Sequence, residues 1–159
     1  MKVILPGSYD PITTGHMEII RYAAEKYSAV YVVVFINESK VYRFTVDQRL
    51  KMLEIATRGM ANVVVDAYSG RVVDYMRMHG IEQIVKGYRN EKDVEWERVQ
   101  AEYNLREGGF STELIRCNPS FENISSTRVR TMLDAGESVC GLLPSGVLEF
   151  IEKINNQEG

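Results

Sequence analysis

The sequence has few cysteines and no long apolar run. It holds only Cys117 and Cys140, which are too few for a disulfide framework and lack the spacing of a zinc site. No stretch approaches the roughly 20 apolar residues that a membrane-spanning helix needs. The net charge is only −3, so no basic excess points to nucleic acid as a partner. These absences favour a globular protein of a reducing compartment, and we expect a cytoplasmic location without membrane or nucleic-acid partners.

The chain has the length and composition of one folded domain. Its 159 residues are 45% hydrophobic and 26% charged, as is typical of a globular domain with a buried core. It contains no internal repeat, low-complexity segment or linker, so residues 1–159 are predicted to form a single domain. Residues 155–159 are polar and are expected to fray. Because a strand-like run begins at Val3, we expect no signal peptide.

Strand and helix patterns alternate along the chain. Short apolar or β-branched runs predict five strands, which begin near residues 3, 30, 63, 84 and 113. Amphipathic segments between them predict helices, one of which starts at a capping box from Thr45 to Gln48. This alternation predicts an α/β fold, a single Rossmann-like doubly wound sheet of five parallel strands flanked by helices. Such a sheet binds ligands at the carboxyl ends of its strands.

The loop after the first strand carries the strongest functional signal. It reads Pro6-Gly-Ser-Tyr-Asp-Pro-Ile-Thr-Thr-Gly-His16 and leads into an amphipathic helix. Gly15 lets the backbone pass close to a phosphate, and His16 stands at a helix start, where free amides attract anions. The loop matches neither the dinucleotide-binding G-x-G-x-x-G motif nor the P-loop. An exposed first turn is the alternative, and we favour a phosphate site.

A second helix start has the same chemistry. Ser125, Ser126 and Thr127 bring three hydroxyls together just before Arg128 and Arg130. Hydroxyls, free amides and one of these arginines would make a second phosphate site. A plain N-cap needs only one hydroxyl, so the motif alone leaves both interpretations open.

Three further cations follow strands of the predicted sheet. Lys40 comes after the second strand, and Lys86 and Arg89 follow the fourth. Each alone is typical of a solvated surface. Together, on the edge that carries His16, they indicate a polyphosphate ligand for an otherwise acidic protein.

The motifs resemble those of a known superfamily. The first loop is similar to the [ST]-x-G-H signature, and Ile124-Ser-Ser-Thr-Arg-Val-Arg130 to the I-S-S-T-x-x-R signature, of the nucleotidyltransferase superfamily of α/β-phosphodiesterases. Within it, Lys86-Gly-Tyr-Arg-Asn-Glu-Lys-Asp-Val-Glu-Trp-Glu97 resembles the R-G-x-R-x-x-x-D-x-E-x-E segment of the bacterial phosphopantetheine adenylyltransferase family. The resemblance covers nearly the whole chain, with the motifs in the same order.

The resemblance implies an enzyme of coenzyme A biosynthesis. It implies transfer of the adenylyl group of ATP to 4′-phosphopantetheine, giving dephospho-coenzyme A and pyrophosphate by direct in-line attack without a covalent enzyme intermediate. Mg²⁺ is the implied cofactor and travels with ATP, so no protein metal ligand is implied. The resemblance further implies a homohexamer, with coenzyme A as a candidate feedback ligand.

The resemblance also assigns roles to single residues. His16 is implied to stabilise charge at the α-phosphate and Lys40 to hold the transferring group, which makes both catalytic. The implied ATP-binding residues are Gly7, Ser8, Tyr9, His16, Gly87, Arg89, Glu97, Phe121, Ser125, Ser126 and Thr127. The implied acceptor-binding residues are Ser8, Lys40, Val72 and Lys86. Lys86 stands where the family has arginine, which keeps the charge but loses bidentate geometry.

Three other functions remain open on the sequence alone. Another small nucleotidyltransferase, for nicotinamide mononucleotide or cytidylyl transfer, shares both signatures, although the segment 86–97 and the short length disfavour it. A nucleotide-binding regulator without turnover would not need both His16 and Lys40. A flavodoxin-like binding module would not explain the hydroxyls at 125–127.

Overall fold

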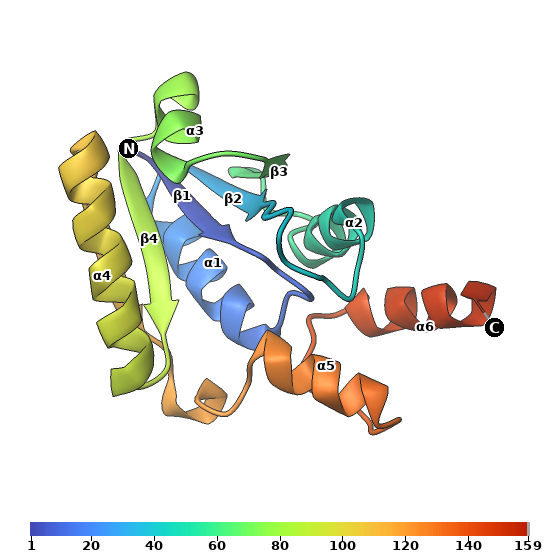
Figure 1. The fold of residues 1–159 in the computed structure, drawn as a ribbon. Helices are drawn as coiled ribbons and strands as arrows, with labels where there is room; N and C mark the ends of the chain where they lie inside the picture. The colour runs from blue at the N-terminus through green and yellow to red at the C-terminus, as the bar shows by residue number, and fades with distance from the viewer. Residues whose placement is uncertain (159) are drawn as a thin grey trace.

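The computed structural model describes residues 1–158 and is built on one parallel sheet (Figure 1). The strands are β1 (Lys2–Gly7), β2 (Ala29–Phe35), β3 (Val63–Tyr68), β4 (Gln83–Tyr88) and β5 (Thr112–Arg116). They lie in the order β3-β2-β1-β4-β5, and every neighbouring pair is parallel. The predicted α/β sheet of five parallel strands is therefore confirmed.

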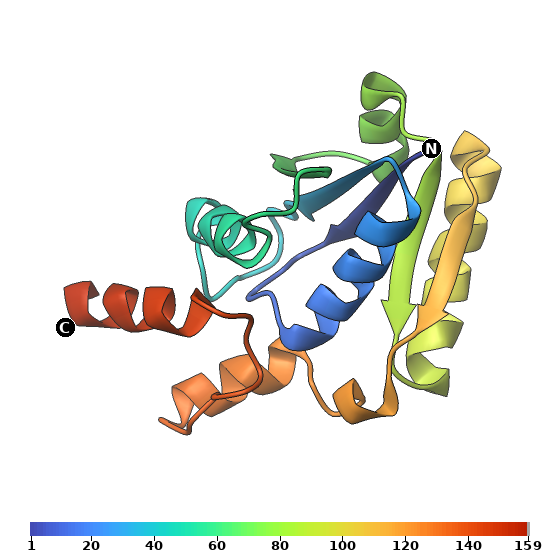
Figure 2. The same ribbon diagram turned by 180° about the vertical axis from the view of Figure 1, so that it is seen from behind.

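Helices link the strands and cover both faces of the sheet. They are α1 (Thr14–Lys26), α2 (Val46–Ala56), α3 (Val72–His79), α4 (Glu91–Gly108), α5 (Ser126–Asp134) and α6 (Val147–Glu158), with a short 3-10 helix η1 (Pro119–Phe121). α1 and α2 cover one face, and α3 and α4 the other (Figure 1, Figure 2). None of the described helices has the length and apolarity needed to cross a membrane.

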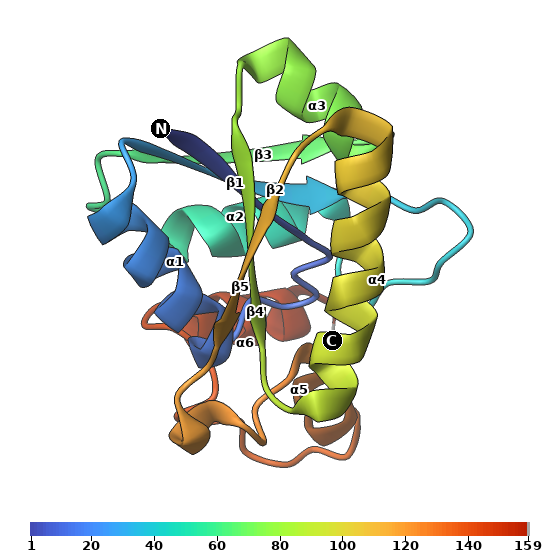
Figure 3. The same cartoon turned by 90° about the vertical axis from the view of Figure 1, so that its left-hand side faces the viewer.

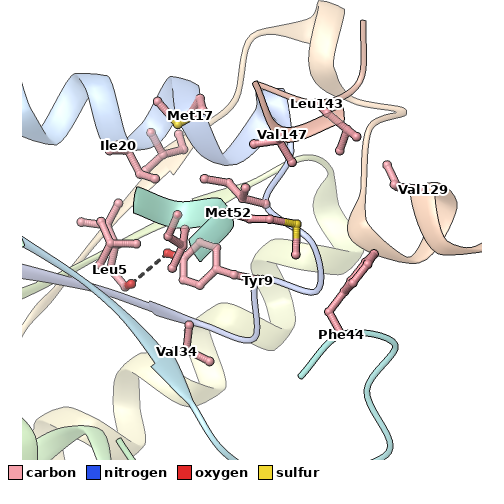
Figure 4. Packing of buried hydrophobic residues seen from close by; sticks show 14 of the residues in the cluster. Leu5, Tyr9, Met17, Ile20, Val34, Phe44, Met52, Val129, Leu143 and Val147 are labelled. Atoms are coloured by element: carbon pink, nitrogen blue, oxygen red, sulfur yellow. Dashed lines mark hydrogen bonds between the residues drawn. The ribbon is translucent and has the colours of Figure 1, made fainter. Parts of the chain in front are cut away.

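Alternate residues of the central strands supply two cores. In β1, Val3 and Leu5 pack in the core that contains α1 and α2, while Ile4 packs in the core beneath α3. In the larger core, shown in Figure 4, the Tyr9 hydroxyl donates a 2.8 Å hydrogen bond to the Leu5 carbonyl. Both faces of these strands are covered, which explains why their sequences are continuous apolar runs instead of alternating ones.

Helix boundaries follow local caps, with one difference at the end of the chain. Thr45 caps α2 through the predicted capping box with Gln48. α6 continues to Glu158, so residues 155–158, which were expected to fray, are helical. Ile151 and Ile154 pack into the larger core and hold this helix against the body of the protein. The last residue of the chain lies outside the described residues.

The strands β1 and β4 separate toward their carboxyl ends. β1 pairs with β2 along its whole length, from Lys2 to Gly7, but with β4 only at Val3 and Ile4. From β1 the sheet extends to β2 and β3 on one side and to β4 and β5 on the other. The strands β4 and β5 run beside α4 (Figure 3). The point where β1 and β4 separate is the topological switch point at which doubly wound sheets bind ligands.

Candidate active site

Three adjoining cavities lie at the carboxyl ends of the strands. The central cavity, of about 280 Å³, lies between the ends of β1 and β4 and is lined by residues 5–9, His16 and residues 85–87. It shares residues 6–8 and Lys86 with a large cavity of about 750 Å³. It shares His16 and Arg89 with a small cavity of about 250 Å³. The central cavity therefore joins the other two.

The site residues expected from the sequence all line these cavities. The small cavity is lined by His16, Gly87, Arg89, Phe121, Ser125, Ser126 and Thr127. The large cavity is lined by Gly7, Ser8, Lys40, Val72, Lys86 and Glu97. Tyr9 lines the central cavity, although its buried hydroxyl is already bonded to the Leu5 carbonyl of β1. The fold thus gathers these residues at one edge of the sheet, and their roles remain predictions.

His16 is oriented by the start of its own helix. The Thr13 backbone N–H donates to His16 Nδ1 over 3.0 Å, and the His16 N–H donates to Thr13 Oγ1 over 3.4 Å. This is a capping box with histidine in the third helical position. Because Nδ1 accepts a hydrogen bond, the ring proton of the neutral imidazole resides on Nε2. Nε2 is then free to donate to a ligand.

The surroundings of His16 favour the uncharged ring. Burial, together with the positive charges of Lys86 and Arg89, lowers the pKa of His16 from 6.5 to about 4. The Tyr9 ring packs against the imidazole with 5.0 Å between the ring centroids. At neutral pH His16 is therefore a hydrogen-bond donor without charge, suited to stabilising negative charge on a phosphoryl oxygen.

Lys86, which was expected to follow the fourth strand, lies within β4, and Arg89 comes directly after it. Each of these two cations has a carboxylate partner on α4. Lys86 Nζ lies 3.5 Å from Glu97 Oε1 and donates to the Pro6 carbonyl over 3.4 Å. Arg89 makes a bidentate pair with Asp93, with Nε–Oδ2 and Nη2–Oδ1 distances of 2.9 and 3.2 Å. The carboxylates hold the cations beside the central cavity, where they can bind phosphate oxygens with strong charge-assisted hydrogen bonds.

The hydroxyls at the start of α5 have separate structural tasks. Ser125 is the N-cap, and its Oγ accepts from the Arg128 N–H over 3.1 Å. Ser126 Oγ donates to the Pro11 carbonyl over 2.7 Å and so ties α5 to the first loop. The first turn of α5 thereby faces the small cavity, where its free amides suit an anion.

The two arginines of α5 do not complete this phosphate site. Arg128 Nη1 donates to the Asn123 carbonyl over 3.0 Å, and Arg130 Nη1 donates to the Asp10 carbonyl over 2.8 Å. Among the described residues that line the small cavity, the arginine is Arg89. The suggestion that Arg128 or Arg130 supplies the positive charge is therefore not supported, because backbone carbonyls bind both guanidinium groups.

Sequence reasoning missed two buried charges beneath the site. Asp10 is 2% exposed, and its carboxylate accepts the backbone N–H groups of Arg43 and Phe44, each over 2.9 Å. Arg49 is also 2% exposed and donates to the Ser8 carbonyl over 3.0 Å. A signal for Arg49 was present, because it lies one helical turn before Met52 and so on the apolar face of α2.

The walls of the large cavity differ from those of the other two. Phe35, Tyr42 and Trp96 give it aromatic surfaces, and Gln100 and Asn104 add amide groups. The cations of its lining are Lys40, Lys86 and Arg71, and the Arg71 guanidinium is paired with Asp74 at 3.0 Å. An elongated ligand with an apolar chain, amides and a terminal phosphate suits this distribution.

Comparisons with known proteins point to one family. A family model described as cytidylyltransferase-like matches residues 4–132. A phosphopantetheine adenylyltransferase of Frankia casuarinae is 40% identical over 156 residues, which cover 96% of each chain. The enzyme of the same name from Corynebacterium diphtheriae is 38% identical and covers 98% of this chain and 99% of its own. That from Thermobifida fusca is 37% identical over 93% of this chain and 90% of its own.

Proposed function

The chain belongs to the phosphopantetheine adenylyltransferase family of cytidylyltransferase-like nucleotidyltransferases, and we propose that it transfers the adenylyl group of ATP to 4′-phosphopantetheine. The products are dephospho-coenzyme A and pyrophosphate, in a step of coenzyme A biosynthesis. One observation carries the proposal. A cavity lined by His16 and Lys86 joins a pocket with anion-binding groups to a longer pocket with aromatic and amide walls.

ATP is assigned to the small cavity. Arg89 and the first turn of α5, with Ser125, Ser126 and Thr127, offer charge and amides to its β and γ phosphates. Phe121 presents an aromatic face on the same cavity, on the side proposed for the adenosine. This placement brings the α-phosphate of ATP toward His16 and the central cavity.

The acceptor is assigned to the large cavity. The pantetheine chain is apolar with two amides, which suits aromatic walls that carry Gln100 and Asn104. Its phosphate is placed between Ser8, Lys40 and Lys86, because these side chains supply a hydroxyl and two positive charges. Val72 contributes apolar wall at the start of α3.

The proposed reaction is a direct in-line displacement. An oxygen of the acceptor phosphate forms a bond to the α-phosphorus of ATP while the bond from that phosphorus to the bridging oxygen of pyrophosphate breaks. His16 donates from Nε2 to a non-bridging oxygen of the α-phosphate, and the ammonium group of Lys40 neutralises the transferring group. Reactions of this class are catalysed mainly by positioning and by charge stabilisation, which the neutral donor and the surrounding cations supply.

Mg²⁺ enters this proposal together with ATP. Within residues 1–158, no group of three or more His, Cys, Asp or Glu side chains comes together to hold a metal. We assign the ion to the nucleotide phosphates, because Mg²⁺ keeps most of its water and binds substrate phosphates in sites of this kind.

We also propose for this chain the assembly and the feedback ligand that the family resemblance implies. Trp96, Val99 and Tyr103 leave an exposed apolar stripe along α4, with the i, i+3, i+7 spacing of one helix face. This stripe supports assembly of several copies, and we propose the homohexamer. Coenzyme A contains the adenosine and phosphopantetheine parts of dephospho-coenzyme A, and it is the proposed feedback ligand. The free Cys117 and Cys140 suit a cytoplasmic location, which we also propose.

One assay tests the proposed activity. The protein is mixed with ATP and Mg²⁺, with either 4′-phosphopantetheine or nicotinamide mononucleotide, and released pyrophosphate is measured. We expect pyrophosphate release with 4′-phosphopantetheine and none with nicotinamide mononucleotide. Release only with the mononucleotide would show that the proposed acceptor is wrong. A second assay with CTP in place of ATP tests the proposed nucleotide donor. No release from protein that is folded by circular dichroism would favour a nucleotide-binding regulator.

A further inference from the structure

Lys40 lies in a loop whose two ends are fixed. This loop, residues 36–44, connects β2 with α2. The Lys40 N–H donates to the Asn37 carbonyl over 3.0 Å, which closes a turn at the start of the loop. At its other end, the last two amides donate to the buried carboxylate of Asp10. The backbone around Lys40 is therefore ordered, while its exposed side chain has a flexible four-carbon stem.

Tyr42 contacts both the backbone and the charge of this loop. Its hydroxyl oxygen accepts the Asn37 N–H over 3.2 Å. Its ring centroid lies 5.6 Å from Lys40 Nζ and 4.0 Å from Arg49 Cζ. Both distances fall within the range in which a cation is attracted to an aromatic ring. The half-buried ring thus contacts Arg49 beneath the site and Lys40 in the site itself.

Arg49 gives this ring a rigid support. Its Nε donates to the Phe44 carbonyl over 3.1 Å and its Nη1 to the Ser8 carbonyl over 3.0 Å. Burial lowers the pKa of Arg49, and the negative charge of Asp10 opposes that effect. A planar guanidinium held by two carbonyls is fixed in direction, unlike an ammonium. The same group therefore anchors the Ser8 loop and carries the Tyr42 ring.

We propose that Tyr42 is a positioning residue for Lys40, with its ring on Arg49 holding the Lys40 ammonium in register with Ser8 and the central cavity. The inference rests on the proposed adenylyl transfer, in which Lys40 binds the transferring group. Without the ring, the lysine side chain would sample more rotamers and lose more entropy in each productive complex. Tyr42 therefore supplies part of the preorganisation on which a reaction catalysed by positioning depends.

Paired variants of Tyr42 test the role of the ring. We expect Tyr42→Leu to lower kcat/KM for 4′-phosphopantetheine by roughly tenfold, as expected for one cation–π contact in a partly desolvated site. KM for ATP should stay within about twofold, because the small cavity is built from other elements. Tyr42→Phe, which keeps the ring and loses the hydroxyl, should restore most of the loss. A loss as large in Tyr42→Phe as in Tyr42→Leu would overturn the proposal.

A double-mutant cycle separates an effect through Lys40 from direct contact with the acceptor. Because Tyr42 also lines the large cavity, it could lower activity by touching the acceptor itself. If Tyr42 acts through Lys40, Tyr42→Leu has little further effect in the Lys40→Ala background. If the two losses multiply instead, Tyr42 does not act through the lysine, and the positioning role is wrong.

A binding measurement keeps this test separate from the proposed function. Calorimetric titration with 4′-phosphopantetheine is carried out on the wild type, both single variants and the double variant. We expect Tyr42→Leu to weaken binding only while Lys40 is present. Wild-type protein that binds the acceptor in this pattern but releases no pyrophosphate would reject the transfer reaction and keep the Tyr42–Lys40 coupling. Should Tyr42→Leu fail to fold, Tyr42→Gln removes the ring and keeps a polar group for Asn37.

Discussion

The backbone N–H of Thr13 donates a hydrogen bond to His16 Nδ1 over 3.0 Å. In most capping boxes the third helical residue is glutamate or glutamine, whose side-chain oxygen accepts this bond. Here an imidazole nitrogen accepts it, and the same ring keeps a second nitrogen with its proton. One side chain therefore closes the start of α1 and offers a donor to the central cavity. The helix cap sets the tautomer that the proposed chemistry needs.

Replacing His16 should impair turnover more than binding. We expect His16→Gln to lower kcat by about 10²-fold or more, as for the loss of one oxyanion donor elsewhere. Glutamine can keep the capping box, so the helix start and ATP affinity should change little. Steady-state kinetics and calorimetric ATP binding measure the two effects. A variant within a few-fold of wild type would remove His16 from the mechanism.

His16 should also make stability depend on pH. Its pKa is about 4 in the folded protein and 6.5 for the ordinary side chain, so the unfolded chain binds the proton first as the pH falls. The contribution of His16 is complete above pH 6.5 and is lost as the pH falls toward 4. In urea unfolding, the free energy of unfolding of the wild type should therefore fall relative to that of His16→Gln as the pH falls over this range. Two parallel curves would contradict the lowered pKa of this half-buried imidazole.

Lys86 should act through its charge. Lys86→Arg keeps a cation beside Glu97, and we expect kcat/KM within a few-fold of wild type. Lys86→Met removes the cation and leaves Glu97 without its 3.5 Å partner, so kcat/KM should fall by roughly 10- to 100-fold. Lys92→Met is the matched control, because Lys92 is exposed near the start of α4, the helix that carries Glu97. It should leave kcat/KM unchanged. A large loss in Lys86→Arg would show that the site requires an ammonium group.

Asp10 should matter for stability far more than a surface carboxylate does. Asp10→Asn removes a buried negative charge and turns one acceptor of a backbone N–H into a donor. We expect a loss of about 2–4 kcal/mol in the free energy of unfolding. Asp134→Asn is the control, because Asp134 pairs with Arg43 on the surface and its side chain is 66% exposed. That pair is expected to contribute less than about 1 kcal/mol. Equal losses in urea unfolding would contradict the structural role of Asp10.

Local patterns explain why much of the fold could be predicted. The capping box from Thr45 to Gln48 lies within one helical turn, so its geometry follows from neighbouring residues. The central strands β1 and β2 could be found because both of their faces are covered and most of their residues are apolar. The expectation of a frayed end counted polar residues and could not include the packing of Ile151 and Ile154, beyond which α6 continues to Glu158. Fraying itself stays a prediction.

The direction of long side chains could not be predicted. Arg130 was grouped with a phosphate site because it follows the α5 hydroxyls, yet it bonds to the Asp10 carbonyl, 120 positions away in the sequence. The apolar face of α2 includes Arg49, but its spacing does not show that the guanidinium lies between Ser8, Tyr42 and Phe44. A guanidinium group binds whatever carbonyls the fold brings near it, and sequence spacing does not identify them.

The sequence by itself determined the alternation of strands and helices and the two helix starts that suit phosphate, because hydrophobic period and capping act over a few residues. Tertiary structure alone decided how these parts meet. The separation of β1 from β4 opens the central cavity, and the approach of Lys86 and Arg89, together with burial, keeps His16 neutral. Charge state and orientation depend on neighbours that are distant along the chain, so they exist only once the sheet has formed.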